Sequence, residues 1–340
     1  MQKSTEYRNA LHRFAQFLAS ATFLLIIAGG LVTSTGSGLA VPDWPLSYGQ
    51  VMPPMVGGIF YEHGHRMVAT FVGFLTTILA FWVWRVEERR WMRVVAWVAL
   101  GAVIAQGLLG GLTVYYLLPT PVSVLHATLA QTFFSLTVFI AMATSKSWKT
   151  ASQPERPGIG KTQRLAMLLV GSVFVQLILG ALMRHTNSAL AIPDFPLSYG
   201  KLLPPSDGSA VSSLNEYRLT WWDLGPITMA QIWIHFVHRA WAVVVAVLGF
   251  VLARDIFVNH PSESRLREPA LLIVLLLVMQ IFLGGLTVWS GRSVETATAH
   301  VATGALLLAA SVFLAVRAKR YYATDVIEPI VEMVPGLSRS

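Results

Sequence analysis

The chain of 340 residues contains no cysteine. It therefore forms no disulfide, holds no metal through a thiolate and has no redox-active thiol, and cysteine usage does not reveal its compartment. Charged residues are also scarce, at 12% of the sequence, whereas a soluble domain has about 25%. The hydrophobic fraction is 54% and the mean hydropathy is +0.59. This composition excludes an ordinary soluble domain and predicts a protein that crosses a membrane several times.

Eight apolar runs, each about 20 residues long as the hydrocarbon core of a bilayer requires, predict eight transmembrane helices. They lie at about residues 14–34, 61–84, 94–116, 123–145, 165–184, 228–252, 269–289 and 295–316. The first run resembles a signal peptide, but it lacks a convincing small-residue cleavage site and seven further runs follow, so we expect it to be retained. The predicted fold class is an all-α integral membrane protein.

The placement of basic residues predicts the orientation. With eight spans and the N-terminus inside, most of the 25 Lys and Arg residues fall in inside segments. By the positive-inside rule, both termini are expected to be cytoplasmic. The net charge of +8 is explained by this asymmetry and by contact with anionic headgroups of the lipid bilayer. No basic soluble domain is present, so we expect no nucleic-acid partner.

Two segments of the sequence occur twice. Residues 40–49 (AVPDWPLSYG) return as residues 191–200 (AIPDFPLSYG), and residues 110–114 (GGLTV) return as residues 284–288. Such a repeat predicts an internal duplication into two pseudo-symmetric four-helix bundles. The expected regions are an N-terminal half at 1–150, a C-terminal half at 151–325 and a cytoplasmic tail at 326–340.

Each copy also carries a His-Arg pair and a later single His: His65-Arg66 with His126, and His238-Arg239 with His300. All four histidines fall toward the outer ends of predicted spans that run inward. Two helices that run the same way, each with a His at similar depth, can hold a planar cofactor between them, each supplying a ring nitrogen to a central metal. Ionisable residues within spans are costly and usually functional, although each His could instead bond a backbone carbonyl or a neighbouring helix.

Haem fits this pattern better than zinc. Zinc sites gather four ligands around one ion, or three with an open position, whereas these histidines come in pairs with few carboxylates nearby. Two axial histidines within a four-helix bundle are an established way to hold haem. Arg66 and Arg239 are adjacent to candidate ligands and could pair with haem propionates. Alternatively, both arginines reach for the outer headgroups.

One position differs between the two copies. When the His-Arg pairs are aligned, Glu62 stands opposite His235. Glu62 shares a helix face with His65, so it is placed to contact a group bound by His65 and to exchange protons with it. The alternative is a Glu in the first helical turn, favoured by the helix macrodipole. His235 could be a donor to the ligand, an alternative ligand or a packing residue, and His63 is expected to be structural or solvated.

Three glutamines precede glycines by four residues within the predicted spans: Gln106 before Gly110, Gln176 before Gly180 and Gln280 before Gly284. Amides beside glycines indicate close helix packing with interhelical hydrogen bonds, and contact with a cofactor is the alternative.

Together these segments resemble the haem A synthase family. The resemblance rests on residues 62–66 (EHGHR), 33–38 (TSTGSG), 42–45 (PDWP), both GGLTV segments, His126 and His300, and it covers roughly residues 10–320. It implies an eight-helix oxidoreductase whose N-terminal half binds the substrate haem O and whose C-terminal half binds a resident haem b. The implied reaction oxidises the C8 methyl of haem O to a formyl, which gives haem A for terminal cytochrome oxidases.

The resemblance also implies roles for residues and partners. His65 and His126 would be the iron ligands of the substrate haem, His238 and His300 those of haem b, and Glu62 the acidic residue of catalysis. Haem O would come from a farnesyltransferase, and an unidentified partner would transfer electrons. The expected location is the bacterial inner membrane, with the haem sites toward the outer face and a homo-oligomer left open. Some family members carry a cysteine pair in an outer loop, and no mechanism that depends on it operates here.

Two other functions are compatible with parts of the pattern. A di-haem b membrane cytochrome would pass electrons between a quinol and a partner, but it would need two similar sites, and the Glu62–His235 difference favours an enzyme. A transporter built from repeats often has inverted topology and broken helices at the membrane midplane. The repeats here are parallel and their polar residues lie near one face, so a transporter is the less favoured reading.

Overall fold

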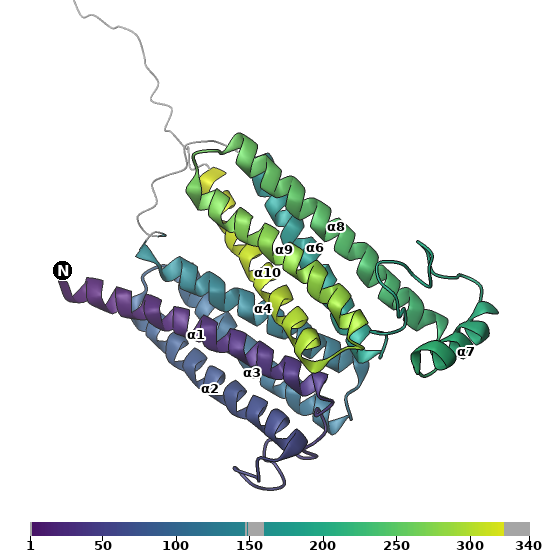
Figure 1. The fold of residues 1–340 in the computed structure, drawn as a ribbon. Helices are drawn as coiled ribbons and strands as arrows, with labels where there is room; N and C mark the ends of the chain where they lie inside the picture. Colours follow the sequence, from purple (N-terminus) through teal and green to yellow (C-terminus); the bar gives the residue numbers. More distant parts are fainter. Residues whose placement is uncertain (1, 147, 149–159, 323–340) are drawn as a thin grey trace, which may run out of the picture.

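The computed structural model describes residues 2–146, 148 and 160–322, and this part of the chain contains helices and no β-strand. The helices are α1 (Gln2–Ser34), α2 (Gly57–Val86), α3 (Arg90–Tyr115), α4 (Thr120–Thr144), α6 (Lys161–His185), α7 (Ala210–Trp222), α8 (Met229–Asn259), α9 (Ser264–Trp289) and α10 (Val294–Tyr322) (Figure 1). All of them except α7 are long and apolar enough to cross a membrane. The predicted all-α membrane fold with eight spans is confirmed.

Most helices extend beyond the predicted apolar runs. For example, α2 begins at Gly57 and α8 continues to Asn259. A helix satisfies its backbone hydrogen bonds internally, so it need not end where the hydrocarbon ends and polar residues begin. The earlier start of α2 puts His65 eight residues into the helix rather than the four that the apolar run suggests.

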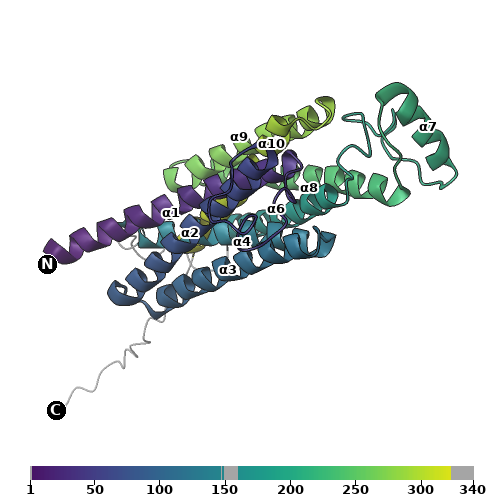
Figure 2. The same cartoon turned by 90° about the horizontal axis from the view of Figure 1, so that it is seen from below.

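The spanning helices form two groups of four. In the first group α1 packs against α2 and α4, and α3 closes the ring between them; in the second, α6, α8, α9 and α10 pack in the corresponding way. Figures 1 and 2 show the two groups side by side, and they meet where α1 and α4 contact α10 and α6. The grouping follows the predicted halves, while their origin by duplication stays a prediction. The predicted boundary at residue 150 and the tail at 326–340 lie outside the described residues.

The apolar core of each group occupies one end of the bundle. In the first group it includes Leu11, Leu79 and Met92, which lie near the start of α1, the end of α2 and the start of α3. In the second it includes Leu252 and Leu266, near the end of α8 and the start of α9. The opposite end carries the loops at 35–56 and 186–228 and is called the loop end below. The apolar residues pack together at one end of each bundle, and the polar residues of the predicted site lie toward the loop end.

Helix α7 was not predicted. It lies within the second long loop and projects beyond the bundle in Figure 2. Arg218 is buried and donates to the backbone oxygens of Leu190 and Gly225, which ties α7 to the loop on either side. Its 13 residues are too few to span a bilayer, so hydropathy gives no signal for it.

Candidate functional site

Each of the four predicted ligand histidines lies against a glycine of a neighbouring helix. The pairs are His65 with Gly29 of α1, His126 with Gly110 of α3, His238 with Gly180 of α6 and His300 with Gly284 of α9. A Cβ at these glycines would lie 3.1, 3.3, 3.2 and 3.3 Å from the Cε1 atom of the ring. A larger residue at any of these positions would displace the imidazole. The four rings therefore rest on the backbone of the four glycines, which are called the wall glycines below.

The second glycine of each GGLTV segment has a different neighbour. A Cβ at Gly111 would lie 2.8 Å from Trp44 Cδ2, and one at Gly285 would lie 3.0 Å from Phe195 Cδ1. Both aromatic rings come from the repeated loop segment. The first glycine of the GGLTV segment therefore leaves space for the histidine ring, and the second leaves space for the aromatic ring of the loop. These two contacts explain why the segment has two glycines, which the sequence alone did not reveal.

The second histidine pair has the separation that one metal ion requires. A His nitrogen binds a metal at about 2.0 Å, so two imidazoles on opposite sides of one ion have ring centroids about 6.4 Å apart. The centroids of His238 and His300 lie 6.5 Å apart, with an interplanar angle of 67°. His65 and His126 are also close enough to interact electrostatically. These donor pairs fit a haem iron with two axial histidines.

A zinc-type cluster is not found in the described part of the chain. There, no three or more His, Cys, Asp or Glu side chains gather in a way that could hold a metal ion. The candidate ligands are two separate pairs, one in each helix group, as the sequence predicted.

All three glutamines make the predicted interhelical hydrogen bonds. Gln106 Nε2 donates to the backbone oxygen of His126 at 3.0 Å, and Gln176 Nε2 donates to that of His238 at 3.0 Å. The third, Gln280, places Nε2 3.4 Å from His300 Nε2. Each glutamine therefore connects its own helix, which also carries the glycine, to the histidine on the neighbouring helix.

The two repeated loop segments fold in the same way. The Asp43 carboxylate accepts the N–H groups of Tyr48 (2.6 Å) and Gly49 (2.7 Å), and the Tyr48 hydroxyl donates to the Ala40 oxygen. Asp194, Tyr199, Gly200 and Ala191 repeat these contacts in the second loop. The Gly49 N–H, followed by that of Tyr48, holds the pKa of Asp43 below its ordinary value because both bonds favour the charged carboxylate.

Arg66 fastens the first loop to α2. Its Nη1 donates to the backbone oxygens of Asp43 (2.7 Å) and Leu46 (2.9 Å), and its Nη2 forms an ion pair with Glu62 Oε1 at 2.6 Å. Arg239 does the same for the second loop, where it donates to the oxygens of Leu197 and Ile192. Both guanidinium groups are loop anchors, and their pairing with haem propionates stays a prediction.

Glu62 and His235 both hold the backbone of their loop. Glu62 is 4% exposed and its Oε2 accepts the Val41 N–H at 2.8 Å; His235 is 3% exposed and its Nδ1 accepts the Ile192 N–H at 3.2 Å. Glu62 does not lie in the first turn of α2, which contains no acidic residue, so the macrodipole explanation for it is wrong. Glu62 and His235 therefore anchor their loops in equivalent positions, and they differ in that the first group uses a carboxylate and the second an imidazole.

His235 also approaches its arginine, but with less acceptor capacity than Glu62. Arg239 Nε lies 3.0 Å from His235 Nε2. A neutral imidazole accepts at only one nitrogen, whereas a carboxylate accepts at both oxygens. Glu62 can therefore accept from the loop and from its arginine at once. His63 is buried and bonds Ser47 Oγ through Nδ1 at 2.8 Å, so it is structural and not solvated.

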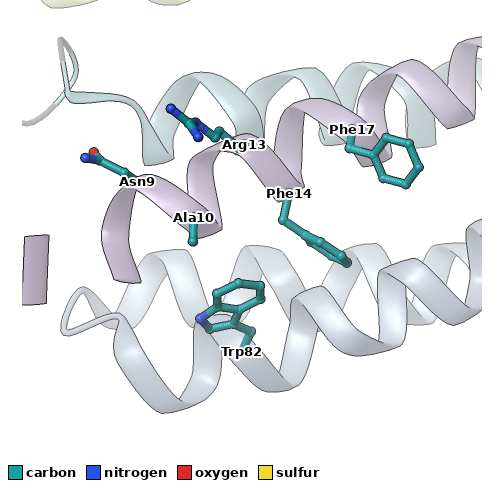
Figure 3. A pocket seen from close by; sticks show the side chains of 6 residues that line it. All are labelled: Asn9, Ala10, Arg13, Phe14, Phe17 and Trp82. Carbon is teal, nitrogen blue, oxygen red and sulfur yellow. The ribbon is translucent and has the colours of Figure 1, made fainter. Parts of the chain in front are cut away.

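A hollow of about 510 Å³ between α1 and α2 lies away from these residues. It is lined by Asn9, Ala10, Arg13, Phe14, Phe17 and Trp82 (Figure 3). Phe14 and Trp82 meet across it with ring centroids 5.6 Å apart. Phe17 is separated from Gly29 by about 18 Å along α1, so the hollow is not part of the histidine site.

Comparison with known proteins identifies what this chain is similar to. Residues 55–312 match the model of a family described as cytochrome oxidase assembly protein, COX15-CtaA. A protein named heme A synthase from Geobacillus kaustophilus is 29% identical over 306 residues, which cover 85% of this chain and 87% of the relative. Heme A synthases of Bacillus licheniformis (27% over 290 residues; 82% and 86% covered) and Chelativorans sp. (28% over 327 residues; 84% of each) are similar to it as well.

Proposed function

The chain belongs to the cytochrome oxidase assembly protein family COX15-CtaA, and on that premise we propose that it is a haem A synthase. In this proposal it is a membrane oxidoreductase that converts the C8 methyl of haem O to a formyl. The observation that carries the proposal is that two similar histidine sites differ in the ionisable group at the loop anchor, where the Glu62 carboxylate stands opposite His235. A chain with one exchangeable and one resident haem needs two similar binding sites and one reactive group.

The proposal assigns each histidine pair a role. His65 and His126 bind and orient haem O through its iron, and His238 and His300 hold haem b. Haem b supplies one-electron transfer when it is bound. The glycine walls fix the rotation of the rings, because a ring that rests on a backbone cannot turn toward it.

The loops and Glu62 complete the site. Trp44, seated on Gly111, and the Arg66 anchor hold the first loop over the loop end of the bundle, where it excludes water from the bound substrate. Oxidation of a methyl group releases protons, and Glu62 is the acidic side chain next to the first pair on its helix. Glu62 takes up a proton at a carboxylate oxygen and releases it to water at the loop end, while Arg66 holds the carboxylate in place.

The rival function, a di-haem b cytochrome, is not favoured. It accounts for two histidine pairs but not for the carboxylate of Glu62 where the second half has His235, and the relatives that cover most of the chain are named heme A synthase.

The location and partners extend the proposal. The chain would lie in the bacterial inner membrane with the loop end outside and both termini in the cytoplasm. Arg85, Arg89, Arg90 and Arg93 lie at the end opposite the loops, as the positive-inside rule requires. Haem O would arrive from a farnesyltransferase, and a separate partner would accept electrons.

The test is extraction of haem from the purified protein, followed by mass analysis. The protein is produced in a host that makes haem O and has no other enzyme that forms haem A. We expect haem b together with haem O, haem A or a partly oxidised haem. Haem b in both halves, with no conversion of haem O in the cells, would establish the di-haem cytochrome instead.

A further inference from the structure

The four histidine walls are alike except at one position. Three of the four wall glycines are preceded, four residues earlier, by a glutamine, and the fourth, Gly29, is preceded by Leu25. Residue 25 occupies the same place relative to its ligand as the glutamines do. The backbone of Leu25 interacts with the His65 ring as the backbones of Gln106 and Gln280 interact with His126 and His300.

The glutamines restrain the ligands beside them. Gln106 Nε2 donates to the backbone oxygen of His126 (3.0 Å) and Gln176 Nε2 donates to that of His238 (3.0 Å), and neither bond uses the ring nitrogen that would bind iron. Such bonds tie the ligand residue to the neighbouring helix at the level of the site. In addition, Gln106 Oε1 is buried without a partner, so this amide keeps its position through Nε2 and through packing alone.

The Leu25 side chain has no amide that could bond His65. It is a partly buried apolar residue that packs against the core of the first group. Within the described residues, no side chain donates to the His65 backbone oxygen or ring. The second group therefore places a glutamine amide beside each of its ligands, whereas the first places one only beside His126.

We propose that Leu25 makes His65 the ligand that detaches when haem enters or leaves the first site, while His126, restrained by Gln106, stays bound. Leu25 is thus a positioning residue that acts through His65. This inference rests on the proposed function, in which the first haem is exchanged and the second is resident. The inference explains why the second group, which has a glutamine amide beside each ligand, would keep its haem. It also explains why the first group, which has an amide beside His126 only, would exchange its haem.

The ligand variants test which histidine detaches. The full-length protein is purified with both sites loaded with haem and reduced in the presence of carbon monoxide, which binds iron that has lost one axial ligand. His65→Ala should keep the first-site haem in a form that binds carbon monoxide, because Gln106 still restrains His126. His126→Ala should lose the first-site haem. The reverse pattern, or equal loss in both variants, would overturn the proposal.

A second experiment tests Leu25 itself through the rate of haem transfer to excess apomyoglobin. An interhelical hydrogen bond in a membrane contributes an amount that corresponds to about three-fold to ten-fold in an equilibrium. Leu25→Gln should slow release from the first site by about that factor and reduce carbon monoxide binding, and Gln106→Leu should accelerate release. Leu25→Met, which keeps the volume and adds no donor, is the matched control and should release haem like the wild type.

The outcomes separate the inference from the function on which it rests. If the wild-type protein releases its two haems at equal rates, the exchange premise of the proposed function fails. If the wild-type first site releases haem faster but Leu25→Gln, with full haem content in the second site, does not slow it, the role of Leu25 is wrong and the proposed function stands.

Discussion

Gly180 of α6 lies against the imidazole of His238, so closely that a Cβ at residue 180 would be 3.2 Å from Cε1 of the ring. The same relationship recurs at the other three histidines, so the walls of the site are backbone and not side chain. A backbone wall has no rotamers, and it fixes a ligand ring more firmly than a side chain would.

We expect Gly180→Val to displace His238. The branched side chain would occupy the space of Cε1, and the resident haem b should lose its low-spin spectrum or part of its content. Gly171→Val is the matched control, because Gly171 is on the same helix and a Cβ there meets nothing within 4 Å. Absorption spectra and haem content of both purified variants check the prediction, and an unchanged spectrum in Gly180→Val would contradict it.

Removal of either second-site ligand should abolish the two-histidine haem. In His238→Ala and in His300→Ala one axial bond is lost, so the low-spin haem b signal should disappear from the spectrum. The assignment of these ligands fails if both variants keep a wild-type low-spin spectrum and full haem b content.

Glu62→Gln should retain haem binding and lose conversion of haem O. The amide oxygen still accepts the Val41 N–H, but the ion pair with Arg66 and the ionisable proton are gone. A general acid or base contributes about 10² to 10⁴ in rate, so haem O should accumulate. Haem extraction measures both properties in one preparation.

His235→Gln is the matched control for Glu62→Gln, because His235 holds the second loop as Glu62 holds the first. It should leave conversion of haem O largely intact. Near-normal haem A formation by Glu62→Gln would remove Glu62 from the mechanism, and loss of first-site haem would make it structural.

The first loop should loosen only in strong acid. The bonds from Gly49 and Tyr48 lower the pKa of Asp43 below its ordinary value of 3.8. A lowered folded-state pKa means that Asp43 stabilises the turn above pH 3.8 and that this contribution is lost as the pH falls through the lower value. Hydrogen exchange of residues 43–49 should therefore show constant protection near neutral pH. Asp43→Asn should remove the acid dependence, and a loop that loosens between pH 5 and 7 would refute the assignment.

Reporter fusions test the orientation. Fusions after Arg90 and Arg265 should report the cytoplasm, and fusions within residues 42–54 or 206–215 should report the outside. One well-behaved fusion with the opposite location would overturn the predicted topology.

Local sequence was sufficient for the helices and for the candidate ligands. Hydropathy is a sum over about 20 consecutive residues, and a lipid-spanning chain without a barrel pattern must be helical, so the eight apolar runs were enough to predict eight spans. The histidine pairs were visible because the repeat kept them in register. The exact helix ends and helix α7 could not be predicted, since neither produces a long apolar run.

The contacts that build the site were decided by tertiary structure. The sequence presents Gly29, Gly110, Gly180 and Gly284 as small residues in apolar runs, and only the packing of α1, α3, α6 and α9 beside the ligand helices shows that each faces an imidazole. Arg66 and Arg239 were predicted to contact the cofactor, and only the folded loops show that each also donates to backbone oxygens. Leu25 carries no sequence signal at all. These relationships join residues 16 to 62 positions apart, and since each depends on which helices pack together and at what depth, no local pattern encodes them.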